Sequence, residues 1–205
     1  MKQSTTQILY NYWNDIRGAR LAPSRFEIEP THLAPILSET FILERGGEGS
    51  YLFRLAGTKV CEQFGRELRG EDFLELAVDD LGAVARGLDS VTSLGAVLQA
   101  EIEATTSDGR LAVFEAIVLP LLHPADEVTR YLGSLSAVSP PLWLGAEPIV
   151  SSWVATQTLV WPDGRPRSLA PDSENQLPFT PELVAARVVR SAHRQFRILE
   201  GGRKE

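Results

Sequence analysis

The stretch that decides the fold is Leu55–Phe73, which reads LAGTKVCEQFGRELRGEDF. An apolar start gives way at Thr58, a residue type that caps helices, and a short helical turn with apolar side chains follows as far as Phe64. Gly65 and Gly70 then allow the chain to change direction twice. The stretch therefore predicts a strand that leads into a short helix and two turns.

Two short apolar segments, 41–44 and 51–55, flank a glycine-rich turn at the start of this stretch. We expect them to form a β-hairpin, because each is strand-length and the turn between them is short. Side chains alternate across a strand, so Phe53 and Leu55 should share one face and Arg54 should lie on the other.

The region after the stretch predicts a helix and then an antiparallel meander. A helix is expected near 79–88, and residues 98–105 alternate strictly between apolar and polar side chains. Residues 111–122 are apolar almost throughout, as in a central strand, and 131–138 form a third strand. Short connections force these strands to be antiparallel, with the first hairpin available to pair at the edge. A further strand is predicted at 152–161.

Both ends of the chain carry amphipathic segments. Residues 4–17 have apolar side chains at helical spacing, with Ser4 and Gln7 at capping-box spacing and Gly18 as a stop. This helix should dock on the protein's own core or pair with a second copy. Residues 182–200 predict another helix with an arginine stripe, suited to packing on the protein or a sister subunit, or to contact with an acidic partner or membrane.

Composition limits the classes of function. A net charge of -7 argues against a surface that follows nucleic-acid phosphates, which needs clustered basic side chains. The single cysteine, Cys61, excludes an internal disulfide and fits a reducing compartment. No apolar run has the length of a signal peptide or of a membrane span. We therefore expect a cytoplasmic protein that neither inserts into a membrane nor binds nucleic acid.

The Leu55–Phe73 stretch resembles the PAS signature, in which a strand gives way to a short helix, a Phe-Gly turn, a Glu-Leu turn and a glycine. Roughly residues 5–150 are similar to a divergent PAS-like family of alphaproteobacteria, formerly a domain of unknown function. The motifs that carry this likeness include Tyr12-Trp13, Arg17-Gly18, Ala22-Pro23, Ile28-Glu29-Pro30, Thr40–Glu44, Gly65–Gly70 and Trp143-Leu144-Gly145.

The resemblance implies an α+β fold: a five-stranded antiparallel sheet with short helices on one face, plus the N-terminal helix and a C-terminal extension. It divides the chain into an N-terminal helix and connection (1–30), a PAS-like core (31–140) and an extension that ends in the amphipathic helix (141–205). The family has no established common ligand, so the resemblance identifies no cofactor.

Catalytic and metal chemistry lack support in the sequence. The three histidines are far apart and Cys61 stands alone, so no metal-ligand spacing is present. No Gly-x-Ser-x-Gly elbow occurs, and Cys61 fits a buried small apolar residue. Glu101 and Glu103 are expected on the solvated face of a strand. We expect no catalytic residues and no metal site.

Two groups of residues are candidates for binding. The first would line a pocket between the sheet and the helices: Phe41, Leu43, Phe53, Leu55, Cys61, Phe64 and Leu98. The second consists of arginines that could contact an anion or a partner: Arg17, Arg20, Arg25, Arg54 and Arg66. Salt bridges to Glu27 and Glu29 explain the arginines near the N-terminus equally well.

Three functions compete. The first is a PAS-like sensory or regulatory module of bacterial signalling, non-catalytic, which binds a small molecule or nothing and transmits through its N-terminal helix to a signalling partner or within a homodimer. The second is a protein–protein adaptor without a ligand. The third is an α+β cone-type enzyme, which would need acid–base residues that converge in a wet pocket.

Overall fold

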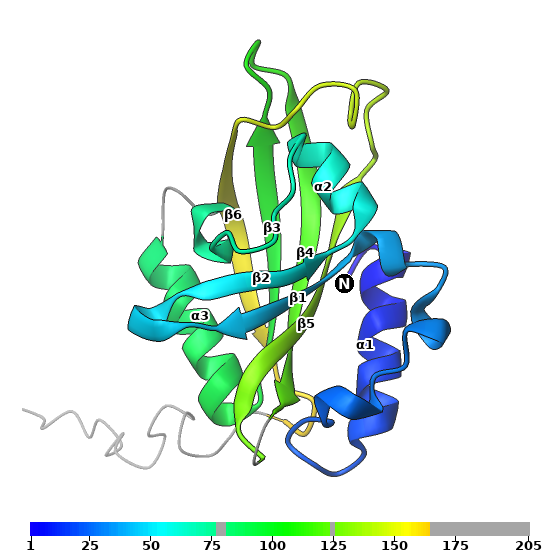
Figure 1. The fold of residues 1–205 in the computed structure, drawn as a ribbon, viewed down its shortest axis with the longest axis vertical. Helices are drawn as coiled ribbons and strands as arrows, with labels where there is room; N and C mark the ends of the chain where they lie inside the picture. Colours follow the sequence, from blue (N-terminus) through cyan, green and yellow to red (C-terminus); the bar gives the residue numbers. More distant parts are fainter. Residues whose placement is uncertain (77–80, 124–125, 165–205) are drawn as a thin grey trace, which may run out of the picture. The chain divides into compact units, whose positions relative to one another are not determined.

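Six antiparallel strands form one sheet in the computed structural model of the chain (Figure 1). They are β1 (Thr40–Arg45), β2 (Tyr51–Ala56), β3 (Val97–Thr105), β4 (Leu111–Leu122), β5 (Val128–Val138) and β6 (Ser151–Val160). Their order is β2-β1-β5-β4-β3-β6, so β2 and β6 are the two edges. The structure describes residues 1–76, 81–123 and 126–164, which belong to one unit, Met1–Pro166.

The α+β fold is confirmed, with one strand more than the five expected. The hairpin of β1 and β2 pairs with β5, and β3, β4 and β5 form the predicted meander. The added strand is β6, which had been predicted as a strand but placed in an extension. It pairs with β3 from Val97↔Val160 to Thr105↔Ser151, because the free side of β3 offers an unpaired row of backbone groups.

One face of the sheet, here called the inner face, is covered by α2 (Thr58–Phe64), the 3-10 turn η5 (Phe73–Leu76) and α3 (Leu81–Leu94). The predicted helix 58–64 is confirmed. α3 extends beyond the predicted end at residue 88, because Val84, Leu88 and Val91 continue one buried stripe. Residues 79 and 80 of that prediction lie outside the described residues.

The other face, here called the outer face, is covered by α1 (Ser4–Arg17) and by the 3-10 turns η1 (Arg25–Glu27), η2 (Pro30–Leu33) and η3 (Leu37–Glu39). Helix α1 docks on its own sheet, where Leu9 and Trp13 pack against Ile117 and Leu132. The predicted bounds of α1 are confirmed, but the capping box is not. Its N-cap is Gln3, without a side-chain cap.

No helix in the described part of the chain has both the length and the apolar character needed to cross a membrane. The helix predicted at 182–200 lies outside the described residues.

Candidate functional site

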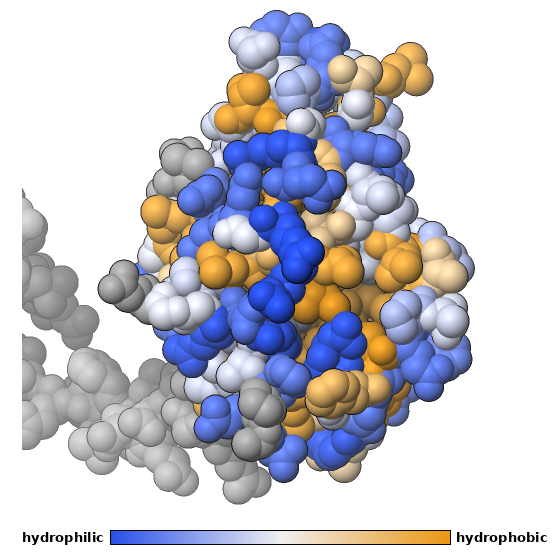
Figure 2. Space-filling model, in the orientation of Figure 1, coloured by the Kyte–Doolittle hydropathy of each residue, from blue (hydrophilic) through white to orange (hydrophobic). Residues whose placement is uncertain are grey.

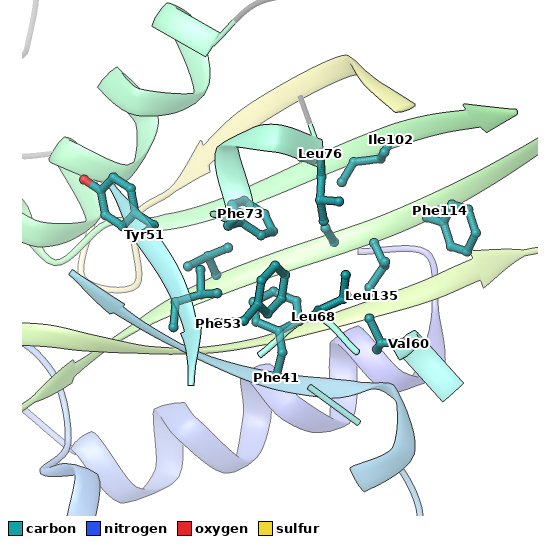
Figure 3. Close-up of a cluster of buried hydrophobic side chains, with 14 of the residues drawn as sticks. Phe41, Tyr51, Phe53, Val60, Leu68, Phe73, Leu76, Ile102, Phe114 and Leu135 are labelled. Carbon is teal, nitrogen blue, oxygen red and sulfur yellow. The ribbon is translucent and has the colours of Figure 1, made fainter. Parts of the chain in front are cut away.

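Most of the residues predicted to line a pocket meet in the core of the inner face (Figure 3). The rings of Phe41 and Phe53 lie 5.5 Å apart in an edge-to-face arrangement, and Phe73 from η5 contacts both, at 5.5 and 5.9 Å. The core members among the predicted residues are Phe41, Leu43, Phe53, Cys61, Phe64 and Leu98, all buried. The structure therefore brings six predicted residues together, packed as a core.

Leu55 is the exception, and its predicted placement is wrong. Its side chain is 47% exposed and is absent from the inner core. Leu43 pairs with Phe53 whereas Ile42 pairs with Leu55, so Arg54 is an extra residue that forms a β-bulge. A bulge breaks the two-residue alternation of the strand. Leu55 therefore lies beside Ile42, which packs against the outer core.

The inner core holds a cavity of about 10 Å³. It lies among side chains of η5, α3, β3, β4 and β6, and Leu98 is the predicted pocket residue that lines it. A single water molecule needs roughly 10–15 Å³ of such space. An organic ligand would therefore have to displace core side chains, each of which packs in an apolar environment.

The chemistry expected of the remaining polar residues is modest. Cys61 is buried, with its Sγ 3.9 Å from the Ala56 carbonyl and 3.9 Å from a Glu67 carboxylate oxygen. Glu101 pairs with Lys2 at 3.2 Å on the outer side of the sheet. Within residues 1–76, 81–123 and 126–164, no group of three His, Cys, Asp or Glu side chains could hold a metal ion.

Four of the five predicted arginines are occupied by carboxylates. Arg17 is buried and donates two hydrogen bonds, of 2.8 and 2.9 Å, to the carboxylate of Asp163. This guanidinium lowers the pKa of the Asp163 carboxyl through the hydrogen bonds it donates. Arg17 also lies 5.4 Å from the centre of the Trp13 ring. Arg17 therefore joins the end of α1 to the turn after β6.

The other arginines pair near the surface. Arg20 is bidentate to Glu27, at 2.9 and 3.0 Å. The remaining pairs are Arg54 with Glu44 at 3.1 Å and Arg66 with Glu71 at 2.9 Å. Arg25 has no ion pair with another described residue. Among the N-terminal arginines, the predicted salt bridge to Glu27 is confirmed for Arg20 alone, whereas Arg17 pairs with Asp163. The five arginines do not converge on one site.

A buried carboxylate holds the start of α1 on the outer face. Glu115 of β4 is 3% exposed and accepts hydrogen bonds from the backbone N–H groups of Lys2, at 2.6 Å, and Gln3, at 3.0 Å. Gln99 donates a third at 3.0 Å. Burial is the largest single influence and acts to raise the pKa of Glu115, but the backbone donors, together with the nearby N-terminal charge and Thr6, lower the pKa below its ordinary value. Glu115 thus fastens the two residues before α1 to the sheet and places a negative charge at the positive end of the helix.

A second carboxylate, Glu39 of η3, lies at the same end of α1. It accepts hydrogen bonds from the hydroxyls of Thr5, at 2.5 Å, and Ser136, at 2.9 Å, and it pairs with Lys59 of α2. Burial acts to raise the pKa of Glu39, whereas these donors lower it, and the net direction is down. Glu39 therefore links α1, α2, η3 and β5.

Exposed apolar side chains lie near this junction. They are Ile8 of α1, Leu37 of η3 and Leu55 of β2, which are 44%, 40% and 47% exposed and are here called the outer patch. The three elements meet: Thr5 bonds Glu39, and a Cβ on Gly57 would lie 2.6 Å from the Leu37 carbonyl. Figure 2 shows hydrophobic surface between the β1–β2 hairpin and α1. Such a patch favours contact with another protein.

The sequence analysis missed Glu115 and Glu39 as functional residues. Glu115 did carry a visible signal, because it is the one charged residue in an otherwise apolar strand. Glu39 carried none, since its partners come from three separate elements, α1, α2 and β5. Asp163 pairs with Arg17 across 146 residues, a separation that local sequence pattern does not record.

Comparisons with known proteins give the following likenesses. A family model described as PAS domain matches residues 1–136. The comparison with curated proteins gave no match. Similar solved structures include a light-oxygen-voltage domain studied with a flavin analogue (14% identity, TM-score 0.42, covering 53% of this chain and 82% of that one). Others are the LOV protein of Rhodobacter sphaeroides (12%, 0.41, 51% and 61%) and the PAS domain of a protein from Colwellia psychrerythraea (15%, 0.40, 53% and 95%).

Proposed function

The chain belongs to the PAS domain family, and from this premise we propose that it is a regulatory module of bacterial signalling that acts through protein contacts and not through a bound ligand. PAS domains are sensory or regulatory modules and are generally non-enzymatic. In this proposal the module is non-catalytic and cytoplasmic. Residues 31–140 form its PAS core, 1–30 its transmitting segment, and 141–205 an extension whose first strand completes the sheet.

The observation that carries the proposal is the filled core of the inner face. Its cavity of about 10 Å³ is smaller by more than an order of magnitude than the roughly 300 Å³ of ordinary ligand pockets. Core packing is close to crystalline, so opening it for a ligand would cost many van der Waals contacts. Regulation through the surface requires no such opening.

The surface that we assign to a signalling partner is the outer patch. Its apolar side chains are flanked by paired charges, Lys59 with Glu39 and Arg54 with Glu44, which resembles the polar rim of a protein interface. The patch also adjoins the carboxylates that hold α1. A partner that contacts Ile8 would therefore act directly on α1, the helix that covers the outer face.

The absence of a ligand requirement is tested on the full chain by native mass spectrometry and thermal shift. We expect the folded protein to have the mass of the polypeptide alone, and a panel of flavins, haem, nucleotides and small carboxylic acids to leave the melting temperature unchanged. Retention of a small molecule, or a saturable rise in melting temperature, would contradict a contact-only mechanism.

The outer patch is tested with the L37E/L55E double variant against the matched control L142E, which changes a fully exposed leucine elsewhere. Proteins cross-linked to the wild type in the source cells should be lost with the double variant and retained with the control. Equal capture by all three proteins would exclude the outer patch as the partner surface.

A further inference from the structure

The two edges of the sheet differ in how they are protected. The free edge of β2 is hydrogen-bonded to residues 70–72. The Phe53 N–H donates to the Glu71 carbonyl at 2.9 Å, and the Gly70 N–H donates to the Phe53 carbonyl at 2.8 Å. The Arg54 bulge adds a charge and a twist to the same edge. Covering segments, bulges and charges are the means by which proteins block edge-to-edge pairing.

Within the described residues, the β6 edge has no covering segment and no charged side chain. No described strand pairs with the free edge of β6. The sequence of β6, SSWVATQTLV, contains no charged residue and no proline. β6 has a bulge of its own at Ala155, because Glu101 pairs with Thr156 and Ile102 with Val154. Beyond it, Thr156–Val160 runs in regular register with β3. These five residues present an open edge, which invites a further strand.

A groove lies beside this regular segment. It has a volume of about 310 Å³ and runs between α3, at Arg86, Gly87 and Ser90, and β6, at Gln157 and Leu159. The Gln157 Oε1 is buried close to Gly87 and accepts no hydrogen bond from any described residue. A buried amide oxygen without a donor costs free energy, so this position favours an added hydrogen-bond donor.

We propose that the β6 edge is a homodimer interface in which Thr156–Val160 pairs antiparallel with the same segment of a second copy. The pairing centres on Thr158, which faces its own symmetry mate, and the two six-stranded sheets become one continuous sheet. Side chains of the added strand that point to the inner side enter the groove beside α3. The interface is separate from the outer patch, so it goes beyond the proposed function.

A second copy fits better than an unrelated peptide, because a two-fold pairing closes both open edges at once. Charge does not oppose it. The part of β3 that pairs with Thr156–Val160 carries one acidic residue, Glu101, which lies opposite Thr156 and one strand away from the edge. In the dimer the two β3 strands are three strand spacings apart, roughly 14 Å. The Debye length at physiological salt is about 8 Å, so their repulsion is largely screened.

The test exploits the symmetry of the proposed pairing. T158K and T158E each place like charges opposite each other in a homodimer, whereas a mixture of the two places Lys opposite Glu. Thr158 is exposed, so both variants should fold. Analytical ultracentrifugation of the full chain should show a wild-type dimer, a dissociation constant raised about tenfold or more in each variant alone, and recovery in the mixture.

T158A is the control for loss of the hydroxyl, and L55K places the same charge on the opposite edge and in the outer patch. Both should remain dimeric. The proposal is overturned by a wild type that stays monomeric at its highest soluble concentration, by T158K dimers as tight as the wild type, or by a mixture that fails to recover. If L55K loses the signalling partner but remains a homodimer, the dimer interface and the outer patch are separate surfaces.

Discussion

Glu115 is a charged residue in the middle of the most apolar strand, and its environment explains why it is tolerated there. A buried carboxylate is costly unless its oxygens accept hydrogen bonds, and here two backbone N–H groups and one side-chain amide supply them. The two backbone donors lie more than 110 residues earlier in the chain. The sequence could therefore mark Glu115 as unusual, but it could not say what the carboxylate binds.

The variant E115Q should be less stable than the wild type by about 2 kcal/mol at pH 7, because an amide cannot accept both backbone hydrogen bonds. The folded state lowers the pKa of Glu115, so its contribution is present above the ordinary value near 4.3 and is lost as pH falls through the lower folded value. Urea unfolding of both proteins between pH 7 and pH 3 should show that the difference in their free energies of unfolding becomes smaller as the pH falls.

E101Q serves as the control, since Glu101 is a partly exposed carboxylate on the same side of the sheet. It should change the free energy of unfolding by less than about 0.5 kcal/mol. A deficit in E115Q that stays constant across the pH range would mean that the carboxylate charge does not hold α1.

At the scale of elements, local pattern predicted the strands and α1 well and their partners less well. Alternation in β3 and the apolar run of β4 are properties of consecutive residues, so the sequence carries them directly. The bulge at Arg54 depends on how β2 pairs with β1, and it reversed the predicted face of Leu55. The place of β6 depends on the free side of β3, some fifty residues away, which no local pattern records.

Docking of α1 rests on Trp13, which is fully buried and donates its indole N–H to the Pro120 carbonyl at 2.8 Å. W13A removes this ring and should lower the free energy of unfolding by about 3–5 kcal/mol. W13F keeps an aromatic ring but leaves the carbonyl without its donor, so it should cost less, about 1–3 kcal/mol.

Denaturant titration measures both values, and I8A on the exposed side of the same helix is the control. That variant should stay within about 1 kcal/mol of the wild type. If W13A were as stable as I8A, α1 would not be part of the cooperative fold.

At the scale of the whole molecule, the inner and outer cores share one sheet. In β4, Ala116 and Val118 face the inner core while Ile117 and Leu119 face the outer core. Local pattern and the family resemblance predicted the sheet and its inner helices, and six of the seven residues named for a pocket do meet. The sequence could not predict that these side chains leave no room for a ligand, because packing volume depends on all side chains together.

Because the two cores share one sheet, a substitution that destabilises one face should also destabilise the other. Cys61 is the single cysteine and lies in the inner core, so its reaction with a thiol reagent reports the opening of that side. W13A, on the outer side, should raise the reaction rate by about a hundredfold or more, matching its loss of stability. Spectrophotometric thiol titration measures the rate, with I8A as control. An unchanged rate in W13A would show that the two faces open independently.

The ion pair between Arg17 and Asp163 has a mechanical implication. It fastens the last turn of α1 to the turn that follows β6. If α1 moves away from the sheet, the Arg17 guanidinium loses its counter-charge and the turn after β6 is released. A pull applied to α1 is thus transferred to the turn after β6 through a bidentate ion pair at the rim of the sheet, and the sheet itself need not bend.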